Sequence, residues 1–299
     1  MTDYAKGLEG VIANESALSN VEGAEGRLSY LGYAIDELVN NCSYEEVVFL
    51  LHKGRLPKQA ELETLQKRLR GDRDLPQGVI DFLKNAPKDA NPMDVLRTGV
   101  SMLGLYDKRA TIGEPNLPNV EEVGLSLVAK VPVIVAAYHR FRQGLELPPT
   151  REDLSEAAHF LYQATGEVPS ETATRTLDVA YTLHADHGMN ASTFSARVTI
   201  ATLSDVYSAI TSAVGRHFQA ALQRFLEQAG SPLRLTGLYL ALNERARDNV
   251  RADTDLRGYL NRDGFAGPIG ELLSRVPFVL EHACMCREGS LSEFNAAGE

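Results

Sequence analysis

From Ile35 to Val214 the sequence repeats one pattern, in which apolar residues recur three and four positions apart and Pro or Gly interrupts them at short intervals. Residues with this spacing lie on one face of an α-helix, and each interruption ends one helix before the next begins. Short alternating runs with glycines, which indicate strands, occur only in residues 7–33. The pattern predicts an all-α fold with a small N-terminal β-hairpin or three-stranded patch.

Individual helices can be placed from their capping residues and their polarity. Ser43 followed by Glu46 is a capping box, which predicts a helix from residue 44 onward. Residues 120–141 are apolar over most of their length, with Pro132 inside, so we expect a long buried helix there. A further helix is predicted for residues 151–164.

Later in the chain, the pattern predicts a helix from Ser170 to about His184. Beyond it, Leu203, Tyr207, Ile210 and Val214 have helical spacing, so we expect them to form one apolar stripe. The helices predicted after this stripe carry more charged residues.

Composition limits the class of protein and its partners. The chain has 299 residues, 44% of them hydrophobic, which is enough for a large core. Its net charge of -10 argues against nucleic acid or an anionic membrane as the main partner. The N-terminus lacks the apolar core of a signal peptide and no long uncharged apolar run follows, so a cytoplasmic location is expected. The three cysteines are expected to be reduced thiols.

Polar chemistry is concentrated in residues 183–194. His184, Asp186 and His187 precede Gly188, which can stop a helix, and Asn190, which can cap the next one. Two histidines three positions apart could share a metal ion, but no third His or Cys follows at a motif spacing. We therefore interpret His184 as a core histidine whose ring nitrogens bond to helix-end carbonyls, and His187 as a ligand contact at the break between two helices.

Several segments resemble the bacterial citrate synthases, and the similarity runs from about Lys6 to Gly215. The segments are Lys6-Gly7-Leu8-Glu9-Gly10-Val11, Pro92-Met93-Asp94-Val95-Leu96-Arg97-Thr98, and residues 183–194 followed by Thr202-Leu203-Ser204-Asp205. The resemblance implies a helical, dimer-forming large domain with a smaller domain that closes over the active site. It also implies the condensation of acetyl-CoA with oxaloacetate, in which a carboxylate and two histidines act as acid–base groups.

The family's site residues are only partly matched. His187 matches the histidine that contacts oxaloacetate, and Arg275, in Ser274-Arg275-Val276, matches a carboxylate-binding arginine. Asp255 matches the catalytic aspartate only with gaps on both sides, and a solvated helix-end carboxylate is the alternative. Where the family has a Gly-Pro-Leu-His-Gly-Gly-Ala-Asn loop, this chain reads Arg216-His217-Phe218-Gln219, and the family's Gly-His-Arg motif is absent.

These departures define the expected organisation. Residues 1–215 would form a citrate synthase-like large domain, residues 216–263 a reduced small domain or connector, and residues 264–299 a helix that returns to the large domain, followed by a polar tail. No metal and no covalently bound cofactor is expected. Acetyl-CoA is the family's co-substrate, but its binding should be weakened because no basic cluster for the CoA phosphates is found.

Two functions remain open. One is a catalytically inactive or strongly impaired scaffold, and the alternative is an active citrate synthase or related condensing enzyme with a rebuilt site. The first is preferred, because groups that act together in catalysis are missing together. A homodimer is expected from the apolar helices at residues 123–137 and 203–214.

Overall fold

The architecture is helical with one small sheet. A computed structural model describes residues 15–22, 26–110, 117–186, 188 and 191–214. Over these residues the chain forms α-helices and a three-stranded antiparallel sheet, so the predicted fold class is confirmed. The beginning of the predicted strand region, residues 7–14, lies outside the described residues.

The elements follow one another with short connections. The strands are β1 (Ser19–Glu22), β2 (Arg27–Tyr30) and β3 (Tyr33–Ala34). The helices are α1 (Ile35–Asn41), α2 (Tyr44–Lys53), α3 (Gln59–Gly71), α4 (Gln77–Asn85), α5 (Pro92–Tyr106), α6 (Leu117–Arg142), α7 (Glu156–Thr165), α8 (Glu171–Leu183), α9 (Ala191–Ala201) and α10 (Val206–Ala213).

Local capping explains where several helices begin. The predicted capping box of α2 is confirmed: the Glu46 backbone N–H donates to the Ser43 hydroxyl, and the Ser43 N–H donates to the Glu46 carboxylate at 2.7 Å. At α5 the Asn91 side chain accepts from the Met93 N–H at 2.9 Å, and Pro92 occupies the first helical position, where its missing N–H costs nothing.

The helix predicted for residues 151–164 begins later, at Glu156, so this boundary was wrong. The Ser155 side chain caps α7 by accepting from the Ala158 N–H. Before it, the carbonyls of Arg151 and Leu154 accept hydrogen bonds from the Arg73 guanidinium at 2.7 and 2.9 Å. These carbonyls point to a distant side chain rather than along a helix axis.

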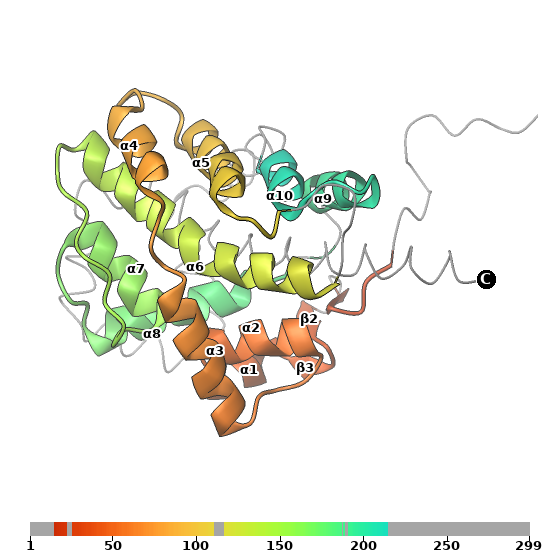
Figure 1. The fold of residues 1–299 in the computed structure, drawn as a ribbon. Coiled ribbons are helices and arrows are strands. Elements are labelled where there is room, and N and C mark those ends of the chain that lie inside the picture. Colours follow the sequence, from red (N-terminus) through yellow and green to blue (C-terminus); the bar gives the residue numbers. More distant parts are fainter. Residues whose placement is uncertain (1–14, 23–25, 111–116, 187, 189–190, 215–299) are drawn as a thin grey trace, which may run out of the picture.

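The long helix α6 is the centre of the core. It contains Pro132, as expected, and its side chains from Val123 to Ala137 are buried except Lys130. Helices α3, α4, α5, α7 and α10 all pack against it. Figure 1 shows α6 crossing the middle of the molecule, with α4 and α5 on one side and α7 and α8 on the other. The predicted buried helix is therefore confirmed.

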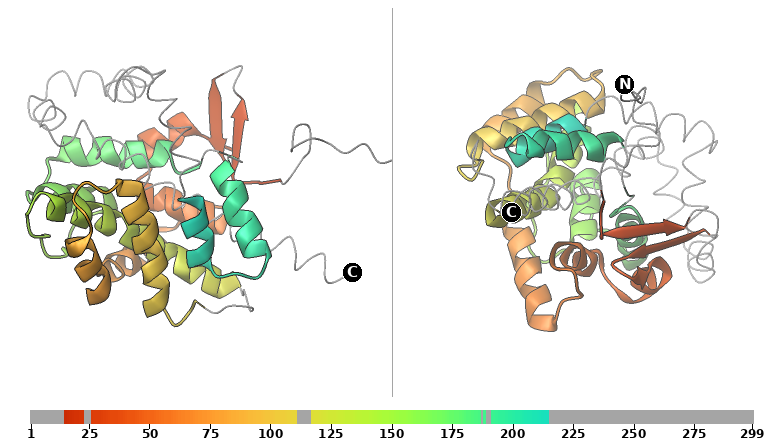
Figure 2. Two further views of the ribbon diagram at one scale, coloured as in Figure 1. Left: turned by 90° about the horizontal axis from the view of Figure 1, so that it is seen from above. Right: turned by 90° about the vertical axis from the view of Figure 1, so that its right-hand side faces the viewer.

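The sheet lies at one edge of the helical body (Figure 2). Strand β2 pairs with both neighbours, and Ser19 of β1 lies opposite Tyr30 at the end of β2. The Tyr30 side chain is completely buried, whereas Val21 of β1 is exposed. One end of this hairpin therefore packs into the protein, which places Ser19 and Tyr30 next to the helices.

The predicted apolar stripe of residues 203–214 is only partly correct. Tyr207, Ile210 and Val214 are buried, but Leu203 is 49% exposed and has a φ of +63°. Asp205 caps α10 by accepting from the Ser208 N–H at 3.0 Å, so the helix begins after Leu203. Leu203 therefore lies in the turn between α9 and α10.

Further expectations concern the chain as a whole. Among the described helices, none combines the length and the apolar character that crossing a membrane requires. The domain boundaries at residues 215 and 263 fall outside the described residues, so the division into three segments stays a prediction, as does the cytoplasmic location.

Of the three cysteines expected to be reduced thiols, the structure describes Cys42, which is buried and carries a free thiol.

Candidate functional site

The stretch with the most polar chemistry connects α8 to α9. Helix α8 ends at Leu183, with His184 as its C-cap, and α9 begins at Ala191. Gly188 has a φ of +73°, a left-handed conformation in which a residue with a Cβ is strained. The predicted break between two helices is therefore confirmed, and it lies between Leu183 and Ala191.

His184 meets its expectation in part: a ring nitrogen bonds to a helix-end carbonyl, but the side chain is not in the core. Its side chain is half-buried, and its Nδ1 lies 2.8 Å from the Ala180 carbonyl oxygen of the last turn of α8. Helix α8 ends at Leu183, so the helical continuation that a two-histidine metal site would need is not present in the described residues up to Asp186. Among the described residues no group of three or more His, Cys, Asp or Glu side chains could hold a metal ion.

Asp186 is the buried centre of the break. Its side chain is 1% exposed, and its Oδ1 accepts hydrogen bonds from the Ser19 hydroxyl and from the Gly188 N–H at 2.9 Å. The Tyr30 hydroxyl lies 3.1 Å from both the Asp186 and the Thr182 carbonyl oxygens. Two residues of the N-terminal sheet therefore hold the backbone and the side chain of one residue in the break.

Most of the predicted site residues lie outside the described residues. These are His187, Arg275 and Asp255; His217 and the predicted helix cap Asn190 also lie outside the described residues. The structure thus describes only the sequence neighbours of His187, at Asp186 and Gly188. Their roles stay predictions.

Ser19 and Tyr30 were not recognised from the sequence. Each is an ordinary strand residue in a short alternating run, and no motif marks them. Their partner Asp186 is more than 150 positions away, at separations of 167 and 156 residues. Only the folded arrangement of the sheet against the end of α8 shows that they act on the break.

A second polar cluster lies deep in the protein. The Arg73 side chain is 0% exposed and its Nη2 lies 2.6 Å from Oε1 of Glu156, whose side chain is 3% exposed. The Glu156 N–H in turn donates to Glu45 at 2.9 Å. Burial raises the pKa of Glu156 to about 7, against the opposing charge of Arg73. This cluster links α2, α7 and the connection between α3 and α4.

A third buried carboxylate joins α8 to α2. Asp178 accepts a hydrogen bond from the Tyr44 N–H at 3.0 Å and one from the Arg175 guanidinium at 2.7 Å. Burial raises the pKa of Asp178 to about 6, and these two donors only partly offset it. Asp178 therefore holds its proton more tightly in the folded chain than in the unfolded chain.

This shift predicts a pH dependence of stability. A carboxyl group with a raised pKa contributes stability that is fully present below its unfolded pKa of about 4 and is lost as the pH rises through about 6. Between about pH 5 and about pH 8, we expect the free energy of unfolding to fall by about 1–2 kcal/mol more in the unmodified protein than in Asp178→Asn. Urea unfolding at both pH values measures this difference. The exposed Asp153→Asn is the control, and an Asp178→Asn slope equal to that of the unmodified protein would contradict the assignment.

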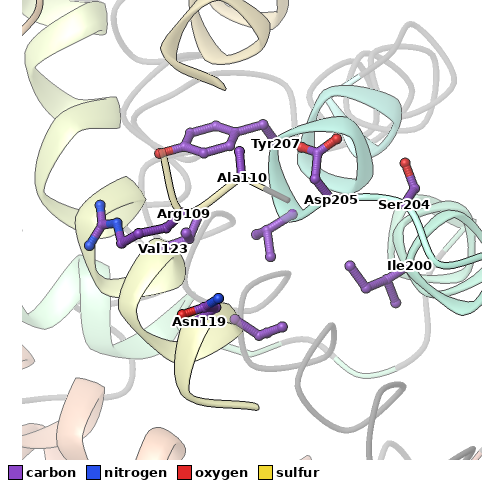
Figure 3. Close-up of a pocket in the computed structure, with 10 residues that line it drawn as sticks. Arg109, Ala110, Asn119, Val123, Ile200, Ser204, Asp205 and Tyr207 are labelled. Atoms are coloured by element: carbon purple, nitrogen blue, oxygen red, sulfur yellow. The ribbon is translucent and has the colours of Figure 1, made fainter. Parts of the chain in front are cut away.

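The structure also contains a small open pocket between the start of α6 and the turn from α9 to α10 (Figure 3). Its charged residues are held by neighbours: Arg109 donates to Asp107 at 2.7 Å, and Asp205 caps α10. Burial alone would raise the pKa of Asp107, but hydrogen bonds from Arg109 and Tyr207 outweigh it and hold the pKa at about 2. With its charged groups already paired, we assign this pocket a structural role.

Comparison with known proteins identifies the family. A family model of the citrate synthase C-terminal domain matches residues 7–217. The chain is 47% identical over 219 residues to the citrate synthase of Haloferax volcanii, and 44% identical over 211 residues to citrate synthase 2 of Bacillus subtilis. These matches take in 71% and 70% of this chain, and 57% and 56% of the relatives, so the matched part spans little more than half their length.

A solved structure agrees with the sequence match. The citrate synthase from Pyrobaculum aerophilum superposes with a TM-score of 0.75 at 27% identity, over 96% of this chain and 88% of that chain. The resemblance read from the sequence is thereby confirmed. The chain belongs to the citrate synthase family.

Proposed function

We propose that this chain binds an oxaloacetate-like keto acid at the break between α8 and α9, with His187 as a contact and Arg275 as the carboxylate-binding arginine. We further propose that the family's condensation of acetyl-CoA with oxaloacetate is absent or strongly impaired. Acetyl-CoA is then a weak ligand, and Asp255 is a candidate for a residual proton-abstracting carboxylate.

The observation that carries the binding proposal is the hydrogen-bonded frame around His187. Asp186 on one side is buried and bonded to Ser19, and Gly188 on the other side donates to Asp186. A side chain that contacts a ligand must be held by rigid surroundings if it is to bind without a large ordering cost. The break supplies such surroundings at the position that matches the family's oxaloacetate histidine.

The proposal of impaired condensation is supported by the sequence beyond the matched region. The family match ends at residue 217. The segment Arg216-His217-Phe218-Gln219 stands where the family's Gly-Pro-Leu-His-Gly-Gly-Ala-Asn loop is expected. In the sequence, Arg216 and Phe218 flank His217, so the glycines that follow the histidine in the family's loop are not matched.

Calorimetry with oxaloacetate alone tests the binding half of the proposal. We expect measurable binding by the unmodified protein and a loss of about tenfold or more in affinity for His187→Ala and Arg275→Ala, since each removes a hydrogen bond to a charged ligand. His139→Ala is the matched control, because it removes a half-buried histidine of α6, and it should leave the affinity for oxaloacetate unchanged. If His187→Ala binds as tightly as the unmodified protein, His187 is not a contact.

The second candidate function is an active citrate synthase with a rebuilt site. It is favoured by the superposition on the Pyrobaculum aerophilum enzyme, which extends over 96% of this chain and therefore further than the family match. The two candidates differ in turnover: an active enzyme releases the thiol of CoA when both substrates are present, and the impaired protein scarcely does.

We also propose that the chain forms a homodimer, although of the two segments first considered, residues 123–137 and 203–214, only Leu203 belongs to the surface proposed here. Residues 123–137 belong to α6 and are almost all buried within the chain, so they are unavailable to a partner. Phe194 and Val198 are 41% and 47% exposed, and they lie four positions apart on α9, hence on one face. With Leu203 in the following turn, they form an exposed apolar surface of the kind that an interface covers.

Replacing one residue of this surface by a charge should separate the subunits. We expect light scattering to give twice the mass of one chain for the unmodified protein and the mass of one chain for Val198→Asp, because an interface excludes an unpaired charge. Val168→Asp is the matched control, since Val168 is 56% exposed in the connection before α8. A Val198→Asp variant that stays dimeric would show that α9 is not the interface.

A further inference from the structure

The start of α2 is capped by two side chains. The Ser43 hydroxyl, next to the helix in the sequence, accepts from the Glu46 N–H. The N–H of Tyr44, the first residue of the helix, donates instead to the Asp178 carboxylate of α8 at 3.0 Å, 134 positions later in the chain. The first N–H groups of a helix have no partner within it, so a carboxylate there satisfies a free donor and faces the positive end of the helix dipole. Asp178 therefore docks α8 onto the start of α2.

The start of α7 repeats this arrangement. The Ser155 hydroxyl is the local cap and accepts from the Ala158 N–H. The N–H of Glu156, the first residue of the helix, donates to the Glu45 carboxylate of α2 at 2.9 Å. The Glu156 side chain in turn lies 2.6 Å from the Arg73 guanidinium. Carboxylates therefore join α8 to α2 and α2 to α7, each at the first N–H of a helix.

The positive charge in contact with Asp178 comes from its own helix. The Arg175 guanidinium donates to Asp178 at 2.7 Å, but the arginine side chain is 43% exposed. It also donates to two backbone carbonyls at the end of α1. Because this charge is shared and lies partly in water, it stabilises the buried carboxylate less than a fully buried partner would.

The other ionisable groups that the structure describes around Asp178 carry no positive charge. They are Tyr44 and Glu45 of α2 and the Cys42 thiol, which precedes α2. One turn farther along α8, Tyr181 packs against Tyr44, with ring centroids 5.0 Å apart. Asp178 itself is 7% exposed. Burial raises the pKa of Asp178 to about 6, and the neighbouring Glu45 acts in the same direction.

We propose that Asp178 is a pH-sensitive latch that holds α8 on the start of α2. A protonated Asp178 still accepts from the Tyr44 N–H through its carbonyl oxygen, so α8 stays docked. An ionised Asp178 is better solvated by water than by its buried surroundings, so α8 separates from α2 more often. The stability that is lost as Asp178 ionises is therefore lost at one contact. This latch does not depend on the keto-acid binding proposed for the break after α8.

Hydrogen exchange of the Tyr44 amide, followed by NMR in the full chain, reports on this contact directly, because this N–H donates to Asp178. With a pKa of about 6 in the docked state and about 4 in the open state, opening becomes about tenfold more frequent between about pH 5 and about pH 8. We therefore expect the protection factor of this amide, corrected for the intrinsic exchange rate, to fall about tenfold over this range.

The Met93 amide is the control within the same spectra. It also lies in the first turn of a helix, and its acceptor at 2.9 Å is the Asn91 side chain, which does not titrate. Its protection factor should stay constant over the same pH range. A local opening of α8 is thereby distinguished from unfolding of the whole chain, which would expose both amides.

Two variants test the charges that drive the latch. Asp178→Asn keeps an oxygen that can accept from the Tyr44 N–H but cannot ionise, so the fall in protection should disappear. Glu45→Gln keeps an acceptor for the Glu156 N–H but removes the neighbouring negative charge. In this variant the fall should have its midpoint at a lower pH.

Three results would overturn the latch. The first is a Tyr44 protection factor that does not change with pH in the unmodified protein. The second is an equal fall at Tyr44 and Met93, because the whole chain then unfolds. The third is a fall that persists in Asp178→Asn. If Asp178→Asn does not fold, Glu45→Gln decides the question, and a midpoint equal to that of the unmodified protein contradicts the latch.

Discussion

Replacing Glu156 by alanine is expected to lower the free energy of unfolding by about 3–5 kcal/mol at about pH 8, where Glu156 is ionised. The reason is the burial of its partner. Arg73 is 0% exposed, and its only other hydrogen bonds in the described structure go to the Arg151 and Leu154 carbonyls. Without the Glu156 carboxylate, a full positive charge stays inside the protein with neutral acceptors alone.

The comparison with other variants isolates this cause. The exposed ion pair between Lys84 and Glu146 is the control, with side chains 43% and 85% exposed, and Glu146→Ala should cost less than about 1 kcal/mol. The double variant Arg73→Met with Glu156→Leu removes the pair together and should recover a large part of the loss. Urea unfolding of the four proteins measures these differences. A loss below about 1 kcal/mol for Glu156→Ala would mean that water reaches Arg73.

The parts of the fold that depend on neighbouring residues could be predicted from the sequence. The capping box of Ser43 and Glu46 places the start of α2, because both hydrogen bonds join residues three positions apart. The long apolar run around Pro132 predicts a buried helix because it leaves no polar face for water. Both features depend only on residues that are close together in the sequence, and the structure confirmed both predictions.

Features that depend on distant residues could not be predicted. Arg73 has the sequence surroundings of a surface arginine, and its partner Glu156 is 83 residues away. Helix α7 starts late, behind its Ser155 cap, and Arg73 bonds to the carbonyls of residues 151 and 154 in the segment before it. Helical spacing alone assigned Leu203 to the stripe of α10, but the cap at Asp205 places it in a turn.

In the candidate site, too, features marked by neighbouring residues could be predicted and those that depend on distant residues could not. The break at Gly188 could be predicted because a glycine and the end of an apolar stripe mark it locally. The role of His187 came from the resemblance to the family and not from its spacing. The restraint by Ser19 and Tyr30 was missed because no local pattern links the N-terminal strands to the end of α8.

The largest effect that we expect is on turnover. The condensation needs a proton abstraction, an enol held by a hydrogen-bond donor and a polarised keto group, and each removal of such a group typically costs about 10²-fold or more in rate. On the proposed function, residues 216–219 stand where the resemblance places the loop with the enol-holding histidine, and the sequence contains no Gly-His-Arg. We therefore expect a rate at least about 100-fold below that of an ordinary synthase.

Thiol release from acetyl-CoA in the presence of oxaloacetate tests this central claim most directly. The assay should compare the purified chain with citrate synthase 2 of Bacillus subtilis, which is 44% identical over the matched residues, under the same conditions and with both substrates saturating. Omitting oxaloacetate gives the background hydrolysis rate. We predict thiol release at least about 100-fold slower than that of the Bacillus subtilis protein, whereas a rate within a few-fold of it would contradict the account and establish an active synthase with a rebuilt site.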